Sequence, residues 1–123
     1  MVRYRREDSV LHVKSYAFAL RIVRCVRFLR ETKNEFILCK QLLRSGTAIG
    51  ALVRESEFAQ SKADFANKLH IALKEANETD YWLSLLNESD YMDETAYQSV
   101  LDDLNELTAL LISSIKTIRK NEE

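Results

Sequence analysis

The feature that most restricts the fold is the position of the chain's only two glycines, because its 123 residues include no proline. Gly46 and Gly50 lie four residues apart, on one stripe of a helix, although glycine costs roughly 1 kcal/mol in a helix interior. Together with Ser45 and other small neighbours, they allow another helix backbone to approach closely. The sequence therefore predicts an all-α chain in which Ser45, Gly46 and Gly50 mark a close helix–helix contact.

Apolar residues recur at helical spacing through almost the whole chain and divide it into four segments. We predict helices near residues 9–32, 36–55, 61–87 and 94–119, separated by short polar turns. Turns of this length make neighbouring helices run antiparallel. We therefore expect one domain over residues 1–123, an antiparallel up-down-up-down four-helix bundle.

Two of the turns carry helix-start signals. Ser61 precedes Asp64 by three residues, which resembles a capping box with Asp in place of the usual Glu. Asp93 is a good N-cap residue, and Glu94 is favourable in the first turn of a helix. These signals predict the starts of the third and fourth helices.

The apolar faces of the first and last helices are wider than a single core requires. In the first helix they spread over roughly 200° of arc, whereas a surface helix of a monomer needs about 100°. In the last helix a coiled-coil-like seam is flanked by further apolar residues. Both patterns predict contacts with another copy of the chain. The seam contains Tyr97, Leu101, Leu104, Thr108, Leu111, Ile115 and Ile118, and the flanking residues are Val100, Leu107, Leu110 and Ile112.

The cysteines and histidines lack the spacing of a metal or catalytic site. Cys25 and Cys39 lack CxxC spacing and a nearby histidine, so we interpret them as buried reduced thiols. His12 and His70 are isolated from other ligands or nucleophiles. We predict no metal, cofactor, catalytic residue or small-molecule substrate. Because no segment approaches the roughly 20 apolar residues of a membrane span and the N-terminus lacks a secretion signal, we expect a cytoplasmic protein with no membrane partner.

Charge is unevenly distributed along the chain, although the net charge is only −1. Residues 1–33 hold nine Lys or Arg against three acids, a net +6, so the remainder carries −7. The basic first helix can pair with acidic neighbours in the bundle or present a basic patch to an anionic partner. The candidate nucleic-acid-binding residues are Arg21, Arg24, Lys40, Arg44 and Arg54.

One flank of the third predicted helix places two carboxylates, Glu75 and Glu78, beside the aromatic Trp82. Paired carboxylates can act as acid and base or hold a metal. A di-iron bundle would need a Glu-x-x-His motif, and no histidine occupies the required position here. We interpret the three residues as a structural ion-pair and aromatic flank that binds arginines of the first two helices.

The segment from Leu42 to Leu86 resembles a known bacterial family. Its motif is LRSGTAIGA at residues 43–51, followed by Glu55, Ser61, Asp64-Phe65, Lys68-Leu69, Ile71-Ala72, Lys74-Glu75, Glu78-Thr79 and Tyr81-Trp82-Leu83. The motif is similar to that of the small four-helix bundle proteins named for the 23S rRNA intervening sequence. Ala48 and Leu52 replace the family's usual Ser and Asn, so polar contacts from these positions are absent.

The resemblance implies an antiparallel four-helix bundle and brings no catalytic residues. Related bundles, including the accessory proteins of diversity-generating retroelements, assemble as ring-shaped pentamers, so the implied first partner is the chain itself. Those retroelement proteins are strongly basic and bind nucleic acid, whereas this chain is nearly neutral.

Three functions remain open at this point. The first is a non-enzymatic homo-oligomeric bundle that associates with RNA or DNA, or acts as an adaptor, through its basic residues. The second is a protein–protein scaffold that binds no nucleic acid; carboxylates engaging Arg44 and Arg54 favour it, whereas an open basic face favours nucleic acid. The third, an enzyme, lacks a nucleophile–base pair, a phosphate-binding glycine loop and metal spacing.

Overall fold

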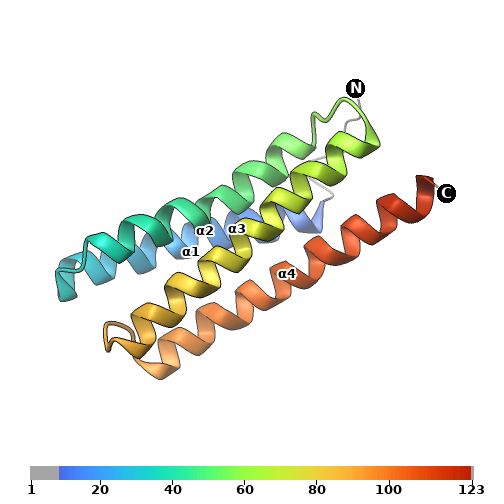
Figure 1. Ribbon diagram of the computed structural model, residues 1–123. Coiled ribbons are helices and arrows are strands. Elements are labelled where there is room, and N and C mark those ends of the chain that lie inside the picture. The colour runs from blue at the N-terminus through green and yellow to red at the C-terminus, as the bar shows by residue number, and fades with distance from the viewer. Residues whose placement is uncertain (1–8, 123) are drawn as a thin grey trace.

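The computed structural model describes residues 9–122, nearly all of them helical. The helices are α1 (Val10–Lys33), α2 (Ile37–Ser56), α3 (Lys62–Glu88) and α4 (Glu94–Glu122). Turns of three, five and five residues connect them, and successive helices run in opposite directions (Figure 1). The predicted all-α four-helix fold is confirmed. Over residues 9–122, no helix is long and apolar enough to cross a membrane.

Side-chain caps mark the starts of α3 and α4. The hydroxyl of Ser61 accepts a hydrogen bond from the backbone N–H of Asp64 at 3.0 Å. The Asp64 carboxylate accepts from the N–H of Gln60 at 3.1 Å, one residue before the position that a capping box would use. Asp93 accepts from the N–H of Ala96 at 2.8 Å and caps α4.

The turn between α1 and α2 depends on Glu35, a role that sequence reasoning missed. Asn34 ends α1 with a left-handed φ of 54°. Glu35 is 8% exposed, and its carboxylate accepts from the N–H groups of Leu38 at 3.1 Å and Cys39 at 2.8 Å. Burial acts to raise the pKa of Glu35, but these backbone donors together outweigh it and lower the pKa. The ionised carboxylate therefore caps α2, since the N-cap residue Phe36 makes no side-chain cap bond.

The buried residues of α3 recur at steps of four and three, so they lie on one face of the helix. Its single polar member, Thr79, lies with its hydroxyl 3.0 Å from that of Ser45 on α2. This hydrogen bond satisfies two polar groups inside an otherwise apolar core and links the two helices. The buried residues of α3 are Phe65, Leu69, Ala72, Ala76, Thr79, Leu83 and Leu86.

The buried face of α4 differs from the predicted seam. Val100 and Leu107, expected at its flank, are 4% and 1% exposed, whereas Tyr97, Leu101 and Thr108 are only half-buried. The reason is that α4 packs far more extensively on α3 than on α1, so its core face is rotated away from the symmetric seam of a coiled coil.

Helices α1 and α2 pack closely because glycines line their contact. A Cβ added at Gly46 would lie 2.8 Å from Cγ1 of Ile22, and one added at Gly50 would lie 3.2 Å from the backbone oxygen of Ser15. Both distances are shorter than the roughly 3.5–4.0 Å of an ordinary van der Waals contact. Any larger side chain would therefore push α1 away from α2.

A substitution at Gly46 tests this packing. Alanine gains about 1 kcal/mol in helix propensity, but overpacking against Ile22 costs about 1–3 kcal/mol. We expect Gly46→Ala to lower the free energy of unfolding by roughly 1 kcal/mol, measured by denaturant titration. In an Ile22→Ala background, where the contacting atoms are gone, the same substitution is expected to stabilise the protein. Equal effects in the two backgrounds would contradict the close contact.

Candidate functional site

The five basic residues identified from the sequence differ in what their side chains contact. Arg21 is directed towards α4, with Nη1 2.6 Å from Oδ2 of Asp103 and Nη2 2.6 Å from the hydroxyl of Ser99. Lys14, two turns earlier on α1, pairs with Glu106 of α4 at 2.8 Å. Part of the basic side of α1 is therefore paired with α4.

Arg44 is directed towards α3, where it meets the carboxylate flank. Its Nη1 lies 3.1 Å from Oε2 of Glu75, and its Nη2 pairs with Oε2 of Glu78. The indole N–H of Trp82 donates to the same Glu78 oxygen at 2.9 Å. The Trp82 hydrogen bond, followed by that of Arg44, lowers the pKa of Glu78. These four side chains form a polar link across the outer side of the α2–α3 contact.

The other three candidates, Arg24, Lys40 and Arg54, are exposed. Among the residues that the structure describes, none of the three takes part in an ion pair. The Arg54 guanidinium lies 5.9 Å from the centre of the Tyr16 ring, a distance that suits a cation–π contact. Carboxylates thus engage Arg44, whereas an aromatic ring engages Arg54.

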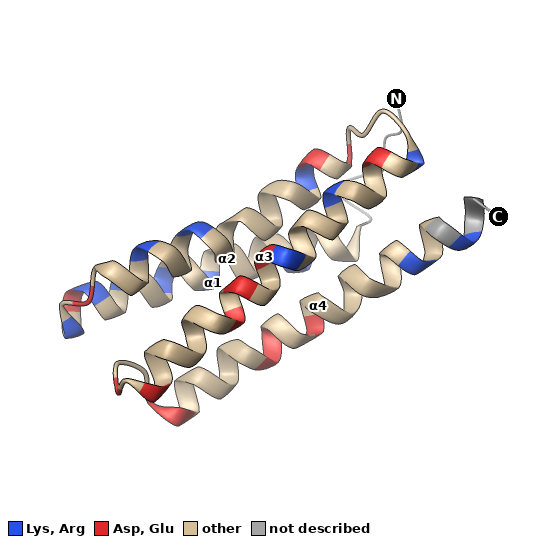
Figure 2. Ribbon diagram, in the orientation of Figure 1, with Lys and Arg blue, Asp and Glu red and all other residues tan. Residues whose placement is uncertain are grey.

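The uneven charge along the sequence places basic and acidic residues on different helices. Basic residues predominate on α1 and α2, and acidic residues on the first half of α4 (Figure 2). Ion pairs cross between these regions at Lys14 and Arg21, so part of the positive charge of α1 is neutralised within the subunit. Arg3, Arg5 and Arg6, which also belong to the basic segment, lie outside the described residues.

A line of apolar side chains runs along the solvent side of α1. Val13, Tyr16, Leu20 and Val23 are 54%, 52%, 38% and 36% exposed. Their steps of three and four residues place them on one helical face. We name these four residues the α1 stripe. The core of the subunit leaves this part of the wide apolar arc of α1 uncovered.

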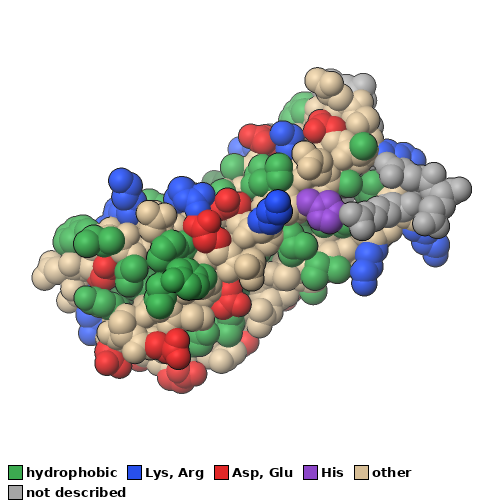
Figure 3. Space-filling view, in the orientation of Figure 1, with side chains coloured by type: hydrophobic (Ala, Val, Ile, Leu, Met, Phe, Trp, Pro, Cys, Tyr) green, Lys and Arg blue, Asp and Glu red, His purple; other side chains and the backbone are tan. Residues whose placement is uncertain are grey.

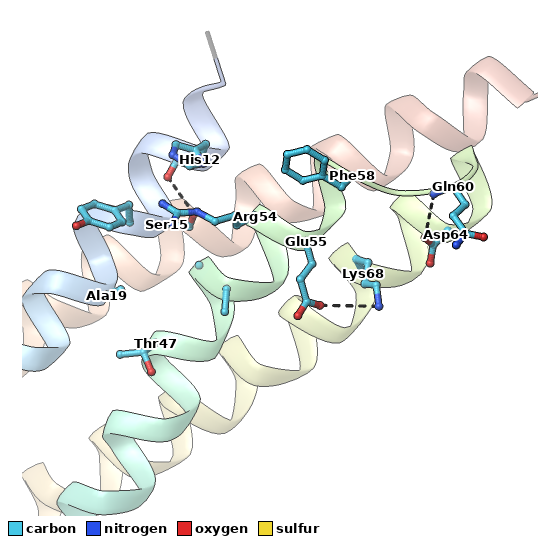
Figure 4. A pocket seen from close by; sticks show the side chains of 13 residues that line it. His12, Ser15, Ala19, Thr47, Arg54, Glu55, Phe58, Gln60, Asp64 and Lys68 are labelled. Carbon is cyan, nitrogen blue, oxygen red and sulfur yellow. Dashed lines mark hydrogen bonds and ion pairs between the residues drawn. The ribbon is translucent and has the colours of Figure 1, made fainter. Parts of the chain in front are cut away.

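Beside the α1 stripe, a groove of about 640 Å³ lies between α1 and α2 and extends towards α3 (Figure 4). Its α1 and α2 walls include small residues, among them Ala19, Gly50 and Ala51, so the groove remains open where the helices approach closely. The large side chains of Tyr16 and Phe58 flank it, and both are about half exposed. The α1–α2 groove is lined by His12, Ser15, Tyr16, Ala19, Thr47, Gly50, Ala51, Arg54, Glu55, Phe58, Gln60, Asp64 and Lys68.

The buried polar groups beside this groove make structural contacts. Ser15 is 1% exposed, and its hydroxyl donates to the backbone oxygen of His12 at 3.1 Å. The His12 ring is turned the other way, with Nδ1 2.6 Å from the Glu57 carboxylate, which ties the start of α1 to the α2–α3 turn. The geometry therefore lacks the hydroxyl–imidazole contact of a nucleophile and its base.

The remaining candidates for chemistry are groups of metal-binding side chains and the two cysteines. Within residues 9–122, no group of three or more His, Cys, Asp or Glu side chains is placed to hold a metal ion. Cys25 is half-buried and Cys39 is buried. Burial, followed by the neighbouring Glu35 carboxylate, raises the pKa of the Cys39 thiol to about 12. Because the thiolate is the reactive form, this environment makes Cys39 unreactive.

A second exposed apolar surface lies on α3 near its C-terminal end, where hydrophobic side chains gather in Figure 3. Tyr81 is 57% exposed, and its ring meets that of Trp82 edge-on, with centroids 4.9 Å apart. Leu85 follows about one turn later and is half-buried. We name Tyr81, Trp82 and Leu85 the α3 ridge. Ile37, which is 80% exposed, begins α2 at the same end of the bundle.

The comparison with known proteins agrees with this architecture. The sequence matches the model of the 23S rRNA-intervening sequence proteins over residues 7–113. The chain belongs to this family. The family assignment that rested on residues 42–86 is thereby confirmed, over most of the chain.

A member of a related family with a known structure has the same fold. It is a protein of unknown function from the S23 ribosomal protein family of Bacteroides thetaiotaomicron VPI-5482, known from a crystal structure. The two chains are 55% identical with a TM-score of 0.85, over 87% of this chain and 99% of the other. No curated protein matches the sequence. The comparisons therefore establish the family and the fold and bring no activity.

Sequence reasoning named several residues of these surfaces but missed how they combine. The sequence analysis assigned Gly50 to close helix packing and Arg54 to nucleic-acid binding. The structure places both residues in one groove beside Tyr16 and Phe58. Trp82 was assigned to an ion-pair flank, whereas its exposed neighbour Tyr81 entered only as part of the family motif, without a role of its own. Tyr81 is on a solvent-facing position of α3, where a polar residue is usual, and this was the available signal.

The network around Glu78 predicts a dependence of stability on pH. Because the pKa of Glu78 is lowered in the folded state, its contribution is present above the ordinary Glu pKa of about 4.3 and is lost as the pH falls below it. We expect Glu78→Gln to lose less stability on acidification than the wild type, measured by denaturant titration across that range. Glu88→Gln, at an exposed position on the same helix, is the control. Identical pH profiles for wild type and Glu78→Gln would contradict this prediction.

Proposed function

We propose that this protein is a non-enzymatic, homo-oligomeric adaptor, whose subunits associate through the α1 stripe and the adjoining α1–α2 groove. The observation that carries the proposal is the exposure of four large apolar side chains along one face of α1, from 36% to 54%. Large contiguous apolar surface on a small soluble domain usually marks an interaction site. The groove beside it supplies concave surface for side chains of a partner.

The composition of this face supports a protein partner. Tyr16 and Phe58 provide aromatic surface, which is enriched at the centres of protein–protein interfaces. Arg54, stacked near Tyr16, adds a guanidinium of the kind that often contributes strongly to binding. Charged groups from α2 and α3, including the Glu55–Lys68 pair at 3.8 Å, border the apolar part. An apolar centre with a polar rim is the usual arrangement of such an interface.

The pairing of the basic residues favours an adaptor over a nucleic-acid-binding protein. Arg21 and Arg44 are engaged by α4 and α3, so two of the five candidate phosphate contacts already have carboxylate partners. An anionic ligand would have to displace these ion pairs. We therefore propose the α1–α2 face as the main interaction surface. The expected number of subunits is five, as in the related bundles.

Charged substitutions in the α1 stripe test the association. We expect the wild type to be an oligomer and a Val13→Asp/Leu20→Asp variant to be a folded monomer, because both side chains are substantially exposed and would place carboxylates in a desolvated contact. Light scattering coupled to size exclusion gives the mass, and circular dichroism with a denaturant titration reports the fold.

The matched control is Asn105→Asp/Thr117→Asp, at exposed positions of α4. This variant is expected to keep the wild-type mass. A monomeric wild type, or a stripe variant that keeps the wild-type mass, would contradict the proposed association.

A nucleic-acid partner is the second candidate, and one observation favours it. Arg24, Lys40 and Arg54 are exposed, and among the described residues no carboxylate pairs with them. In an oligomer, the same three residues would be repeated on every subunit. Phosphate contacts of this kind add up and make affinity strongly dependent on salt.

The two candidates differ in their response to charge reversal. If RNA or DNA binds, Arg24→Glu/Lys40→Glu should reduce retention in a mobility-shift titration, and wild-type affinity should fall steeply with salt. Arg44→Glu is the comparison, because its main expected effect is lower stability through the loss of its Glu75 and Glu78 partners. Absence of binding at low salt would remove the nucleic-acid candidate and leave the adaptor.

A further inference from the structure

We propose that the α3 ridge is a docking surface for a basic amphipathic helix of another protein. This inference rests on the proposed adaptor role and names the chemistry of the partner that the adaptor holds. Helices α2 and α4 each pack against both α1 and α3, whereas within residues 9–122 the backbones of α1 and α3 do not approach each other closely. Helices α1 and α3 are therefore diagonally opposite, and one subunit can use the α1 stripe and the α3 ridge at the same time.

The ridge belongs to a larger apolar surface that includes Ile37 of α2. Arg44 of α2 pairs with Glu78 of α3 across the antiparallel contact between these helices. Ile37 comes about two helical turns before Arg44. Leu85 comes about two turns after Glu78, so the antiparallel arrangement brings Ile37 beside Leu85. Because Ile37 is 80% exposed and Tyr81 is 57% exposed, this surface is contiguous apolar area of the kind that marks an interaction site.

Tyr81 and Trp82 give this surface two aromatic anchors. Their rings meet edge-on with centroids 4.9 Å apart. The indole N–H of Trp82 also donates to Glu78 at 2.9 Å, which fixes the ring. Side chains held in this way lose little conformational entropy on binding. Tyrosine and tryptophan are also common among the residues that dominate the energy of an interface, so the ridge is suited to anchor apolar side chains of a partner.

The charge around the ridge has a single sign. Residues 75–106 contain ten Asp or Glu and no Lys, Arg or His. Four of the ten acids pair with cations of other helices, namely Glu75, Glu78, Asp103 and Glu106. Four exposed acids at the end of α3 and the start of α4 take part in no ion pair among the described residues, namely Glu88, Asp90, Asp93 and Glu94. The side of the bundle that carries the ridge is therefore acidic, in contrast to α1 and α2 (Figure 2).

Two of the unpaired acids border the ridge. Glu88 follows Leu85 by three residues and lies on the same face of α3. The hydroxyl groups of Ser84 and Tyr97 are 3.3 Å apart, so Glu94, about one turn before Tyr97, is level with the end of α3. An apolar centre bordered by carboxylates matches a helix that carries Lys and Arg beside its apolar face. The same carboxylates repel the phosphates of RNA, DNA and anionic lipids.

The single tryptophan of the chain makes a binding test specific to this surface. The probe is a synthetic amphipathic peptide of about 18 residues, or five helical turns, with Leu on one face, Lys and Arg on the other, and no Trp or Tyr. Titration at low salt should shift the emission of Trp82 to shorter wavelength, because the peptide covers its half-buried ring. Fluorescence anisotropy of a labelled peptide gives the affinity, which should fall as salt is added.

Two comparison peptides separate charge from amphipathic shape. One has Glu in place of every Lys and Arg, and the other has the original composition in an order that leaves no apolar face. Both are expected to bind about tenfold more weakly or less. Equal binding of the reordered peptide would overturn the inference, because it would show attraction by charge alone.

Substitutions in the ridge test its apolar centre. Tyr81→Ala/Leu85→Ala should lower the affinity for the probe by about tenfold or more. Val13→Ala/Leu20→Ala, in the α1 stripe, is the matched control and is expected to bind as the wild type does. Circular dichroism and a denaturant titration verify that both variants are folded.

A charge reversal tests the border of the ridge and leaves its apolar centre intact. Glu88→Lys should lower the affinity by about fivefold, since it replaces an attraction by a repulsion. The control is Glu31→Lys, because Glu31 is also exposed and also lies in the last turn of its helix. Equal affinities of these two variants would contradict the proposed role of the acidic border.

The remaining outcomes separate this inference from the proposed self-association. Binding that leaves the emission of Trp82 unchanged would overturn the inference, as would a Tyr81→Ala/Leu85→Ala variant with wild-type affinity. A change in the mass of the oligomer on this substitution would also overturn it, because a second copy would then cover the ridge. Val13→Asp/Leu20→Asp should still bind the probe as a monomer. A monomeric wild type that binds the probe would contradict the proposed self-association and leave the ridge as a docking surface.

Discussion

The close approach of α1 to α2 is the constraint on which the rest of the structure depends. At Gly46 a Cβ would lie 2.8 Å from Ile22, and at Gly50 it would lie 3.2 Å from the backbone of α1. The lack of side chains at these two positions lets the helix axes come together. Gly50 also lines the α1–α2 groove on the outside of this contact, whereas Gly46 is buried against Ile22. The helix propensity that glycine sacrifices is offset by packing within the subunit and, under the proposed function, by contact between subunits.

Electrostatics determines which basic residues remain available for a partner. Lys14 and Arg21 cross to acidic residues of α4, and Arg44 crosses to the carboxylates of α3. These pairs are partly exposed, so each adds little to stability, but they orient neighbouring helices, and those of Lys14 and Arg21 neutralise part of the positive charge of α1. The proposed function assigns the apolar outer faces to protein partners, because the bundle is near neutral and a phosphate backbone attracts proteins chiefly by net positive charge.

Most of the fold followed from local rules. The glycine spacing, the lack of proline and the apolar periodicity predicted four helices, and each observed helix lies within three residues of its expected bounds. Ser61 and Asp93 act as caps because a short side-chain oxygen can reach the free N–H groups of a first turn from within the same segment. Glu35 was missed because it is a long carboxylate placed one residue before the N-cap Phe36, whereas the usual cap is a short polar side chain at the N-cap itself.

The sequence by itself determined the helices, the caps at Ser61 and Asp93, and the family, because these depend on residues within a few turns of one another or on a motif read directly along the chain. Only the tertiary structure decided which faces of the helices stay uncovered. Leu20 and Ile22 are both apolar residues of α1, yet Ile22 is fully buried against α2 and Leu20 is 38% exposed. The rotation of each helix about its own axis, which follows from packing against distant residues, separates core from surface, and so it decides which charges are paired and where a partner can bind.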